Sequence, residues 1–215
     1  MTPSDDPLSG RQPTSHERMT GLPWDASYLS GPAPWDVGHP QPAIARLAAR
    51  GAFAGPVLDA GCGTGENALH LASLGLPVLG IDVAETAIAM ARAKADERRL
   101  AAEFAVADAL TLERLGRRFA TVLDCGLFHT FDRDERPAYV AGLAQVTEPG
   151  GTLHVLCFSD EGPDAGPHPV SRDEVAEAFG PDRDWRLVAV EPDRVETRFH
   201  EGDGAPAWLL TATRG

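Results

Sequence analysis

The sequence predicts a three-layer α/β fold whose sheet is mostly parallel and ends in an antiparallel hairpin. Short apolar runs alternate with helical patterns between residues 56 and 158, an order typical of parallel strands connected by helices on both faces of a sheet. Two further strand-like runs follow without a helix between them, so we expect them to pair as a hairpin at the sheet edge. A chain of 215 residues is long enough for one well-buried domain.

The elements can be placed in order along the chain. A helix is predicted from residue 41, with a proline in its first turn and Gly51 at its end. Apolar runs predict parallel strands at residues 56–60, 77–83, 102–108, 119–126 and 152–158. Helical patterns connect these strands at residues 66–75, 84–99, 111–117 and 133–148. Ser171 and Glu174 form a capping box that starts a last helix, and the hairpin strands are expected within 185–199 and 205–213.

The first 42 residues show no regular helix or strand period. Residues 1–20 are rich in Pro, Ser, Asp and Gly, a composition that buries too little apolar surface to offset the entropy of ordering. We expect a dispensable disordered tail there, followed by a single domain over residues 21–215. Residues 21–42 contain Trp24 and Trp35, each followed by Asp. This segment is predicted to form an aromatic lid over the sheet; the alternative is that both indoles only anchor a loop to the core.

The composition argues against several classes of partner. A formal net charge of -13 disfavours nucleic acid and anionic membranes, because such partners need clustered Lys and Arg. The three cysteines lie in apolar runs without metal-ligand spacing, so we expect no metal site and reduced thiols. No run approaches the roughly 20 apolar residues of a membrane span, and the N-terminus lacks a signal-peptide pattern. We expect a cytoplasmic monomer or homodimer whose partner is a small molecule.

A glycine loop, DAGCGTG (59–65), lies between the first predicted strand and its helix. Glycines at such a turn let the backbone approach a ligand closely, and the helix N-terminus adds partial positive charge. The dinucleotide fingerprint GxGxxG would need Gly at position 66, where Glu66 stands. Because no Lys or Arg lies in the loop to hold a phosphate, we expect a ligand that presents a carboxylate and a cation together.

Acidic residues end the strands around this loop. Asp82 closes the second strand, where a carboxylate can hold a ribose diol, and Asp108 can accept a hydrogen bond from an adenine amino group. Asp124 closes the fourth strand, and Asp59 ends the first. Each acid alone could be a strand-end cap or a solvated charge. Four of them at successive strand ends beside a glycine loop indicate a nucleoside site.

Together these features resemble the class I S-adenosylmethionine-dependent methyltransferases. The resemblance rests on VLDAGCGTGENALHLASLG (57–75), GIDV (80–83), the segment 107–109 and the EPGG turn (148–151), and it covers about residues 41–158. It implies a Rossmann-like seven-stranded sheet, a single methyltransferase domain and S-adenosylmethionine as the cofactor. The cofactor-binding residues that it implies are Trp35, Asp59, Gly61, Cys62, Gly63, Gly65, Asp82, Val83, Asp108, Ala109, Asp124 and Cys125.

The segment PWDVGHPQPAI (34–44) further resembles the thiopurine methyltransferase-like group and its bacterial relatives, which act on small aromatic or thiol acceptors. We therefore expect methyl transfer to a hydroxyl, ring nitrogen or thiol of a small aromatic molecule, such as a secondary metabolite or a xenobiotic. Two alternatives stay open. One is an NAD-dependent oxidoreductase on the same sheet order, which Glu66 disfavours, and the other is a non-catalytic nucleotide-binding module.

Methyl transfer needs a base only when the acceptor enters protonated, and His129 is the candidate base. It follows the fourth strand, at the carboxyl edge where open parallel sheets bind ligands; the alternative is a histidine that fixes this loop by hydrogen bonds. His154 lies in an apolar strand and is expected in the core, and nothing singles out His16 or His200. The residues predicted to contact the acceptor are Trp24, Tyr28, His39, Phe128, His129 and His168.

Overall fold

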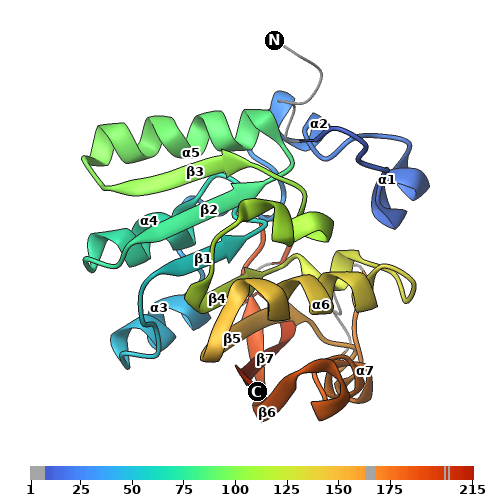
Figure 1. Cartoon of the computed structure of the whole chain (residues 1–215). Coiled ribbons are helices and arrows are strands. Elements are labelled where there is room, and N and C mark those ends of the chain that lie inside the picture. Colours follow the sequence, from blue (N-terminus) through green and yellow to red (C-terminus); the bar gives the residue numbers. More distant parts are fainter. Residues whose placement is uncertain (1–7, 163–167, 201, 203) are drawn as a thin grey trace.

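A computed structural model describes residues 8–162, 168–200, 202 and 204–215, and it confirms the three-layer α/β architecture (Figure 1). The strands are β1 (Val57–Ala60), β2 (Val78–Asp82), β3 (Ala102–Val106), β4 (Phe119–Cys125), β5 (Thr147–Phe158), β6 (Trp185–Val195) and β7 (Ala205–Arg214). The α-helices are α1 (Ser15–Thr20), α2 (Ala26–Leu29), α3 (Pro42–Ala49), α4 (Glu66–Ser73), α5 (Glu85–Arg98), α6 (Arg136–Val146) and α7 (Arg172–Ala178). Short 3-10 helices are η1 (Ala109–Leu115), η2 (Phe128–Thr130) and η3 (Pro181–Arg183).

The seven strands form one sheet in the order β3-β2-β1-β4-β5-β7-β6. β1 pairs with β2 and β4 in parallel, and β3 and β5 extend the parallel part on either side. β7 runs antiparallel to both β5 and β6, which places β6 at the edge. The predicted mostly parallel sheet with an antiparallel C-terminal hairpin is therefore confirmed.

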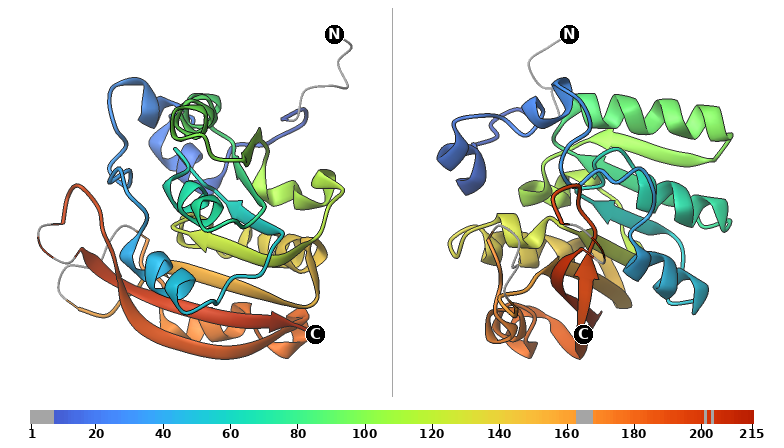
Figure 2. Two further views of the ribbon diagram at one scale, coloured as in Figure 1. Left: turned by 90° about the vertical axis from the view of Figure 1, so that its left-hand side faces the viewer. Right: turned by 180° about the vertical axis from the view of Figure 1, so that it is seen from behind.

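Side chains that alternate along each strand build a hydrophobic core on each face of the sheet. In β1, Val57 packs in the core formed with α3, α4 and α5, whereas Leu58 packs in the core formed with α6 and α7. Val122 and Leu123 of β4 alternate between the two cores in the same way. Because both faces are covered (Figure 2), these strands can be apolar at successive positions.

The end of β5 nearest α6 differs from the expected turn. β5 begins at Thr147, so Pro149, Gly150 and Gly151 lie within the strand. The pairing register between β4 and β5 shifts at this point, and Gly150 has φ 76°. A bulge absorbs the extra residues there, which is why a turn-like sequence can lie in a strand. No helix within the described ranges has the length and apolar character required to cross a membrane.

The N-terminal segment is more regular than its composition predicts. Residues 15–20 form α1 instead of a disordered tail, and Thr14 and Glu17 make a reciprocal capping box at its start. The Ser15 hydroxyl donates to Glu135 at 2.6 Å, which joins α1 to the start of α6. These polar contacts order a segment that has few apolar side chains to bury. Residues 1–7 of the predicted tail lie outside the described residues.

The lid segment also contains one helical turn, α2, which its prolines did not suggest. Figure 1 shows α1 and α2 on the side to which the arrowheads of β2 and β3 point. The N-terminal segment therefore lies at the carboxyl edge of the sheet, where ligands bind in open parallel sheets.

Tyr139→Phe tests a buried hydrogen bond that ties α6 to β4. The Tyr139 hydroxyl donates to Asp124 Oδ2 at 2.7 Å, and both side chains are fully buried. Loss of this donor to a buried carboxylate should lower the free energy of unfolding by about 1–3 kcal/mol, measured by urea denaturation at pH 8. In an Asp124→Asn background the same substitution should cost less, and equal costs in both backgrounds would contradict the coupling.

Candidate functional site

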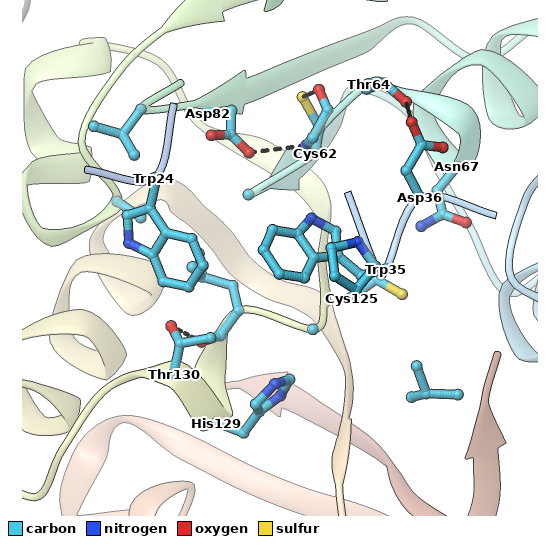
Figure 3. A pocket seen from close by; sticks show the side chains of 18 of the residues that line it. Trp24, Trp35, Asp36, Cys62, Thr64, Asn67, Asp82, Cys125, His129 and Thr130 are labelled. Carbon is cyan, nitrogen blue, oxygen red and sulfur yellow. Dashed lines mark hydrogen bonds between the residues drawn. The ribbon is translucent and has the colours of Figure 1, made fainter. Parts of the chain in front are cut away.

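A cavity of about 260 Å³ lies at the carboxyl edge of the sheet. Its floor comes from the glycine loop after β1 and from the ends of β2 and β4, and its outer walls come from the N-terminal segment and the β6–β7 loop. Figure 3 shows the Trp24 and Trp35 indoles and the His129 ring around one space, with Asp82 and Thr64 on the side of the glycine loop. Segments far apart in the sequence thus enclose one site.

The three glycines of the loop have backbone conformations that other residues rarely adopt. Gly61, Gly63 and Gly65 have φ values of 71°, 53° and 85°, in the left-handed region. A Cβ at Gly61 would lie 2.9 Å from the Leu127 side chain, and one at Gly65 would lie 2.8 Å from the ring of Phe104. The loop is therefore fixed by sterics on one side and leaves its backbone open to the cavity on the other.

Asp82 and Asp108 line the cavity, as predicted. Asp82 accepts hydrogen bonds from the Gly63 and Ala84 amides, each at 2.9 Å, and both its oxygens keep a second lone pair for a ligand. Burial raises the pKa of Asp82, and these backbone hydrogen bonds offset part of the rise. Asp108 accepts from the Leu110 amide at 2.9 Å, and its second oxygen lies 3.8 Å from Arg11 Nε.

Three predicted site residues do not line the cavity. Asp124 turns into the core, where it accepts hydrogen bonds from Tyr139 and from the Leu127 and Phe128 amides. Phe128 is fully buried against Phe179, because the η2 turn points it away from the cavity and leaves Leu127 there instead. The prediction that Phe128 contacts the acceptor is therefore not supported.

Asp59 is the third of these residues, and it is buried at the end of β1. Among the described residues its carboxyl oxygens have no hydrogen-bond partner of regular geometry. Burial, and then the charges of Asp124 and Asp82, raise the pKa of Asp59 from 3.8 to about 7; the Ala68 amide lowers it slightly without forming a regular hydrogen bond. The Asp59 side chain therefore lies behind the glycine loop and does not line the cavity.

The remaining predicted residues meet around one cavity. They are Trp24, Tyr28, Trp35, His39, Gly61, Cys62, Gly63, Gly65, Asp82, Val83, Asp108, Ala109, Cys125, His129 and His168. The cavity also receives Arg11, His16, Phe158, Phe199 and His200, which the sequence reasoning did not select. The capping box of Thr14 and Glu17 could have indicated that His16 is ordered, because it predicts a helix in the segment that was expected to be a disordered tail.

Two aspartates attach the N-terminal segment to the sheet domain. Asp25 accepts hydrogen bonds from the Thr86 amide at 2.7 Å and from the Thr86 hydroxyl at 2.9 Å, at the start of α5. Asp36 accepts from the Thr64 hydroxyl of the glycine loop at 2.9 Å. Each follows a tryptophan that lines the cavity. In both Trp-Asp pairs the indole therefore faces the cavity while the carboxylate fixes the backbone.

The indoles belong to a continuous row of rings. His16 stacks on Trp24 with centroids 4.2 Å apart and an interplanar angle of 12°. Trp24 meets Trp35 edge to face at 5.8 Å, and Trp35 donates from Nε1 to the Tyr28 hydroxyl at 2.9 Å. His168 extends the row beyond His16, at 5.6 Å. This row, which we call the aromatic wall (Tyr28, Trp35, Trp24, His16 and His168), suits a flat apolar ligand.

His129 lies in the cavity as a buried, neutral imidazole. Its Nδ1 has no hydrogen-bond partner among the described residues, and its ring lies 4.6 Å from that of Phe158. Burial, followed by the charges of His168, Arg136 and His16, lowers the pKa of His129 to about 3. The unprotonated ring is thus available to accept a proton. In contrast, His154 is a core residue as predicted, bonded to Thr211 at 3.0 Å.

The described part of the chain contains no group of three or more His, Cys, Asp or Glu side chains arranged to hold a metal ion. The side chains that line the cavity suit an organic ligand, with carboxylates near the glycine loop and aromatic rings on the outer wall.

Comparisons with known proteins agree with this geometry. The family model described as a methyltransferase domain matches residues 57–151. The chain is 38% identical over 180 residues to the 2-heptyl-1-hydroxyquinolin-4(1H)-one methyltransferase of Mycobacteroides abscessus, covering 82% of this chain and 77% of that protein. It is 32% identical over 162 residues to the Arabidopsis thaliana protein named "Probable thiol methyltransferase 2", covering 74% of this chain and 71% of that one.

A solved structure is also similar along most of the chain. It comes from work on the conversion of a disulfide bond into a thioacetal group during echinomycin biosynthesis. The two chains are 40% identical with a TM-score of 0.75, and 84% of each is covered. The similarity thus extends well beyond the glycine loop.

Asp59→Asn should reduce the pH dependence of stability. The pKa of Asp59 is raised in the folded state to about 7, so its favourable contribution is full below the unfolded value of 3.8 and is lost as the pH rises through about 7. The free energy of unfolding, measured with urea at pH 5, 6.5 and 8, should fall less steeply in Asp59→Asn than in the parent. Exposed Asp182→Asn is the control, and parallel profiles for Asp59→Asn and the parent would contradict the assignment.

Proposed function

Because the chain belongs to the class I S-adenosylmethionine-dependent methyltransferases, we propose that it methylates a hydroxyl, ring nitrogen or thiol of a small planar aromatic molecule. The observation that carries this proposal is the aromatic wall, which faces His129 across the cavity that the glycine loop also lines. A named hydroxyquinolinone acceptor in one relative and a thiol methyltransferase name in another support the same class of acceptor.

The residues of the loop fit the cofactor. A Cβ at Gly63 would lie only 3.1 Å from the Tyr28 hydroxyl. The space between them is therefore narrow, and we propose that it holds the amino-acid part of the cofactor. Asp82 has free lone pairs that could hold a ribose diol, and we propose that Asp108 and Ala109, which line the same cavity, hold the adenine. S-adenosylmethionine supplies a methyl group already activated on a sulfonium. The chain therefore has to align the acceptor and exclude water.

His129 is the proposed base for acceptors that enter protonated. The acceptor proton would pass to a nitrogen of the neutral His129 as the acceptor atom bonds to the methyl carbon, and it would leave to solvent afterwards. The lowered pKa keeps His129 unprotonated throughout the neutral range. The same low pKa makes it a weak base, so it can assist only where the acceptor loses its proton as the new bond forms, as with N-hydroxyl, phenol or thiol groups.

Residues 21–42 are proposed to act as a fixed aromatic lid. The hydrogen bonds of Asp25 and Asp36 support this, as does the bond from the Arg198 amide to the Pro34 carbonyl at 2.8 Å. Trp24 and Trp35 would then shield the sulfonium from water and face its positive charge. Residues 11–20 complete the same wall, so the proposed lid begins before residue 21 and its N-terminal part is not dispensable.

The two other classes of function receive less support. Glu66, which replaces the third fingerprint glycine, is bound by Arg98 at 2.8 Å and by Lys94 at 2.8 Å. It therefore has a structural role that a dinucleotide loop would not require. A module that only binds nucleotides has little need of a buried neutral imidazole beside an aromatic wall.

Asp82→Ala should weaken binding of S-adenosylhomocysteine, because a charged acceptor of the ribose hydrogen bonds is lost. The expected loss is about 1–3 kcal/mol, measured by titration calorimetry. Glu103→Ala on the neighbouring strand β3 is the matched control, since Glu103 is exposed and paired only with Arg117. Unchanged affinity in Asp82→Ala would remove Asp82 from the ribose site.

A panel of hydroxyquinolones, phenols and aromatic thiols, read by the mass of methylated product, tests the proposed function directly.

We expect His129→Ala to lower kcat by about 10²-fold or more with a protonated phenol, and to change KM much less. With a thiol that is already ionised at the assay pH, the same variant should keep nearly the parent kcat. His70→Ala on α4 is the control. Equal losses with both acceptors would mean that His129 is structural, and no product from any acceptor would overturn the function.

A further inference from the structure

We propose that His16 and His168 form a second polar subsite of this cavity, which hydrogen-bonds a ring nitrogen or carbonyl oxygen of the acceptor while His129 faces the group that is methylated. The inference rests on the proposed function. It assigns a specificity role to two histidines on segments outside the family match at residues 57–151.

The His16 ring is held in a defined orientation at the cavity. It stacks on Trp24 at 4.2 Å, and its Nδ1 lies 3.5 Å from His168 Nε2. Among the described residues, no hydrogen bond engages the other nitrogen of either ring. The neighbouring acid Glu17 accepts hydrogen bonds from Thr14 and Arg11, so it does not occupy His16. Two imidazoles with free nitrogens therefore line a wall that is otherwise apolar.

The backbone at His168 adds an independent observation. His168 has φ 54°, in the left-handed region that costs about 1–2 kcal/mol for a residue with a Cβ. The other such residues among those described, Arg99 and Asp184, are helix C-caps, where this conformation is common. His168 lies outside every helix that the structure describes. Strained conformations of this kind tend to persist where the side chain has a role in a site.

The charges of the cavity indicate what these imidazoles bind. Among the described residues that line it, the acids are Asp36, Glu66, Asp82 and Asp108. Asp36 and Asp82 are bonded to the glycine loop, Glu66 is paired with Lys94 and Arg98, and Asp108 caps η1. Each of these acids is therefore engaged by the glycine loop, by η1 or by a basic side chain, and among the described residues none of them bonds to His16 or His168. In a hydrogen-bonded pair of imidazoles that each carry one ring proton, one of the two outward nitrogens donates and the other accepts, so the pair can hydrogen-bond a ring nitrogen or a carbonyl oxygen of a heteroaromatic acceptor.

The three imidazoles are close enough to influence one another. The charges of both His168 and His16 act to lower the pKa of His129, and burial with His168 lowers that of His16. An acceptor that fills this space meets His129 and the His16–His168 pair together. An acceptor ring system with two polar positions would give hydrogen-bond partners to both His129 and the His16–His168 pair. A ring with one polar group would leave the His16–His168 pair without a partner on the acceptor.

The test compares two ligands of the same shape. 4-Hydroxyquinoline, which in water is mainly its 4(1H)-quinolone tautomer, and 1-naphthol share a two-ring shape, and the first carries a ring N–H and a carbonyl oxygen where the second carries a C–H and a hydroxyl. Dissociation constants are measured by calorimetry on protein saturated with S-adenosylhomocysteine, so the result does not depend on turnover. The parent should bind 4-hydroxyquinoline about tenfold more tightly than 1-naphthol, the worth of one hydrogen bond.

His16→Phe keeps a flat ring on Trp24 and removes both nitrogens. It should weaken 4-hydroxyquinoline about tenfold and change 1-naphthol less than twofold, and His16→Gln should restore part of the loss. His70→Phe is the control. An equal effect of His16→Phe on both ligands, or a parent that does not prefer 4-hydroxyquinoline, would overturn the subsite. If the subsite were rejected in this way, methylated product from a different acceptor would still support the methyltransferase function. If the parent kept its preference for 4-hydroxyquinoline but no acceptor gave methylated product, the function would be rejected and the subsite retained.

Discussion

The pairing of β1 with β4 is the constraint on which the whole site depends. From β1 the chain proceeds to α4 on one face of the sheet, and from β4 it proceeds to α6 on the other. The two connections separate at the carboxyl ends of these strands and leave a crevice that no element fills. The glycine loop and the η2 turn form its sides. Any ligand between them is contacted by backbone on one side and by His129 on the other.

A crevice of this kind is open to solvent, and residues of the N-terminal segment line its outer side. The two Trp-Asp pairs, Trp24-Asp25 and Trp35-Asp36, combine two tasks in adjacent residues. The carboxylates bond to Thr86 and Thr64 on elements whose positions the sheet already fixes. The indoles then lie at defined places over the cavity, although the segment itself contributes only short helices. Substrate specificity can therefore change in this segment without a change in the sheet.

The parts of the site that could be predicted are those encoded by local patterns. The loop glycines and Asp82 follow from strand-loop-helix order, and they line the cavity as expected. Phe128 could not be placed, because the η2 turn that buries it depends on Asp124 accepting the Leu127 and Phe128 amides. His16 could not be placed either, since α1 is held through contacts such as that between Ser15 and Glu135, which lie far apart in the sequence. Composition alone cannot reveal such contacts.

The distribution of charge in the cavity suits the acidic acceptor that we propose. Asp59, Asp82 and Asp124 lie at or beneath the floor, on the side where the cofactor is proposed to bind. Burial raises the pKa of each of them, to about 7 for Asp59 and about 6 for Asp124, so each ionised carboxylate there costs stability. The aromatic wall carries imidazoles, which bear no negative charge and therefore repel no anion. The acids thus lie on the side of the proposed cofactor and the imidazoles on the side of the proposed acceptor, so an acceptor that loses its proton would lie against the imidazoles, with the positive charge of the cofactor between it and the acids beneath the floor.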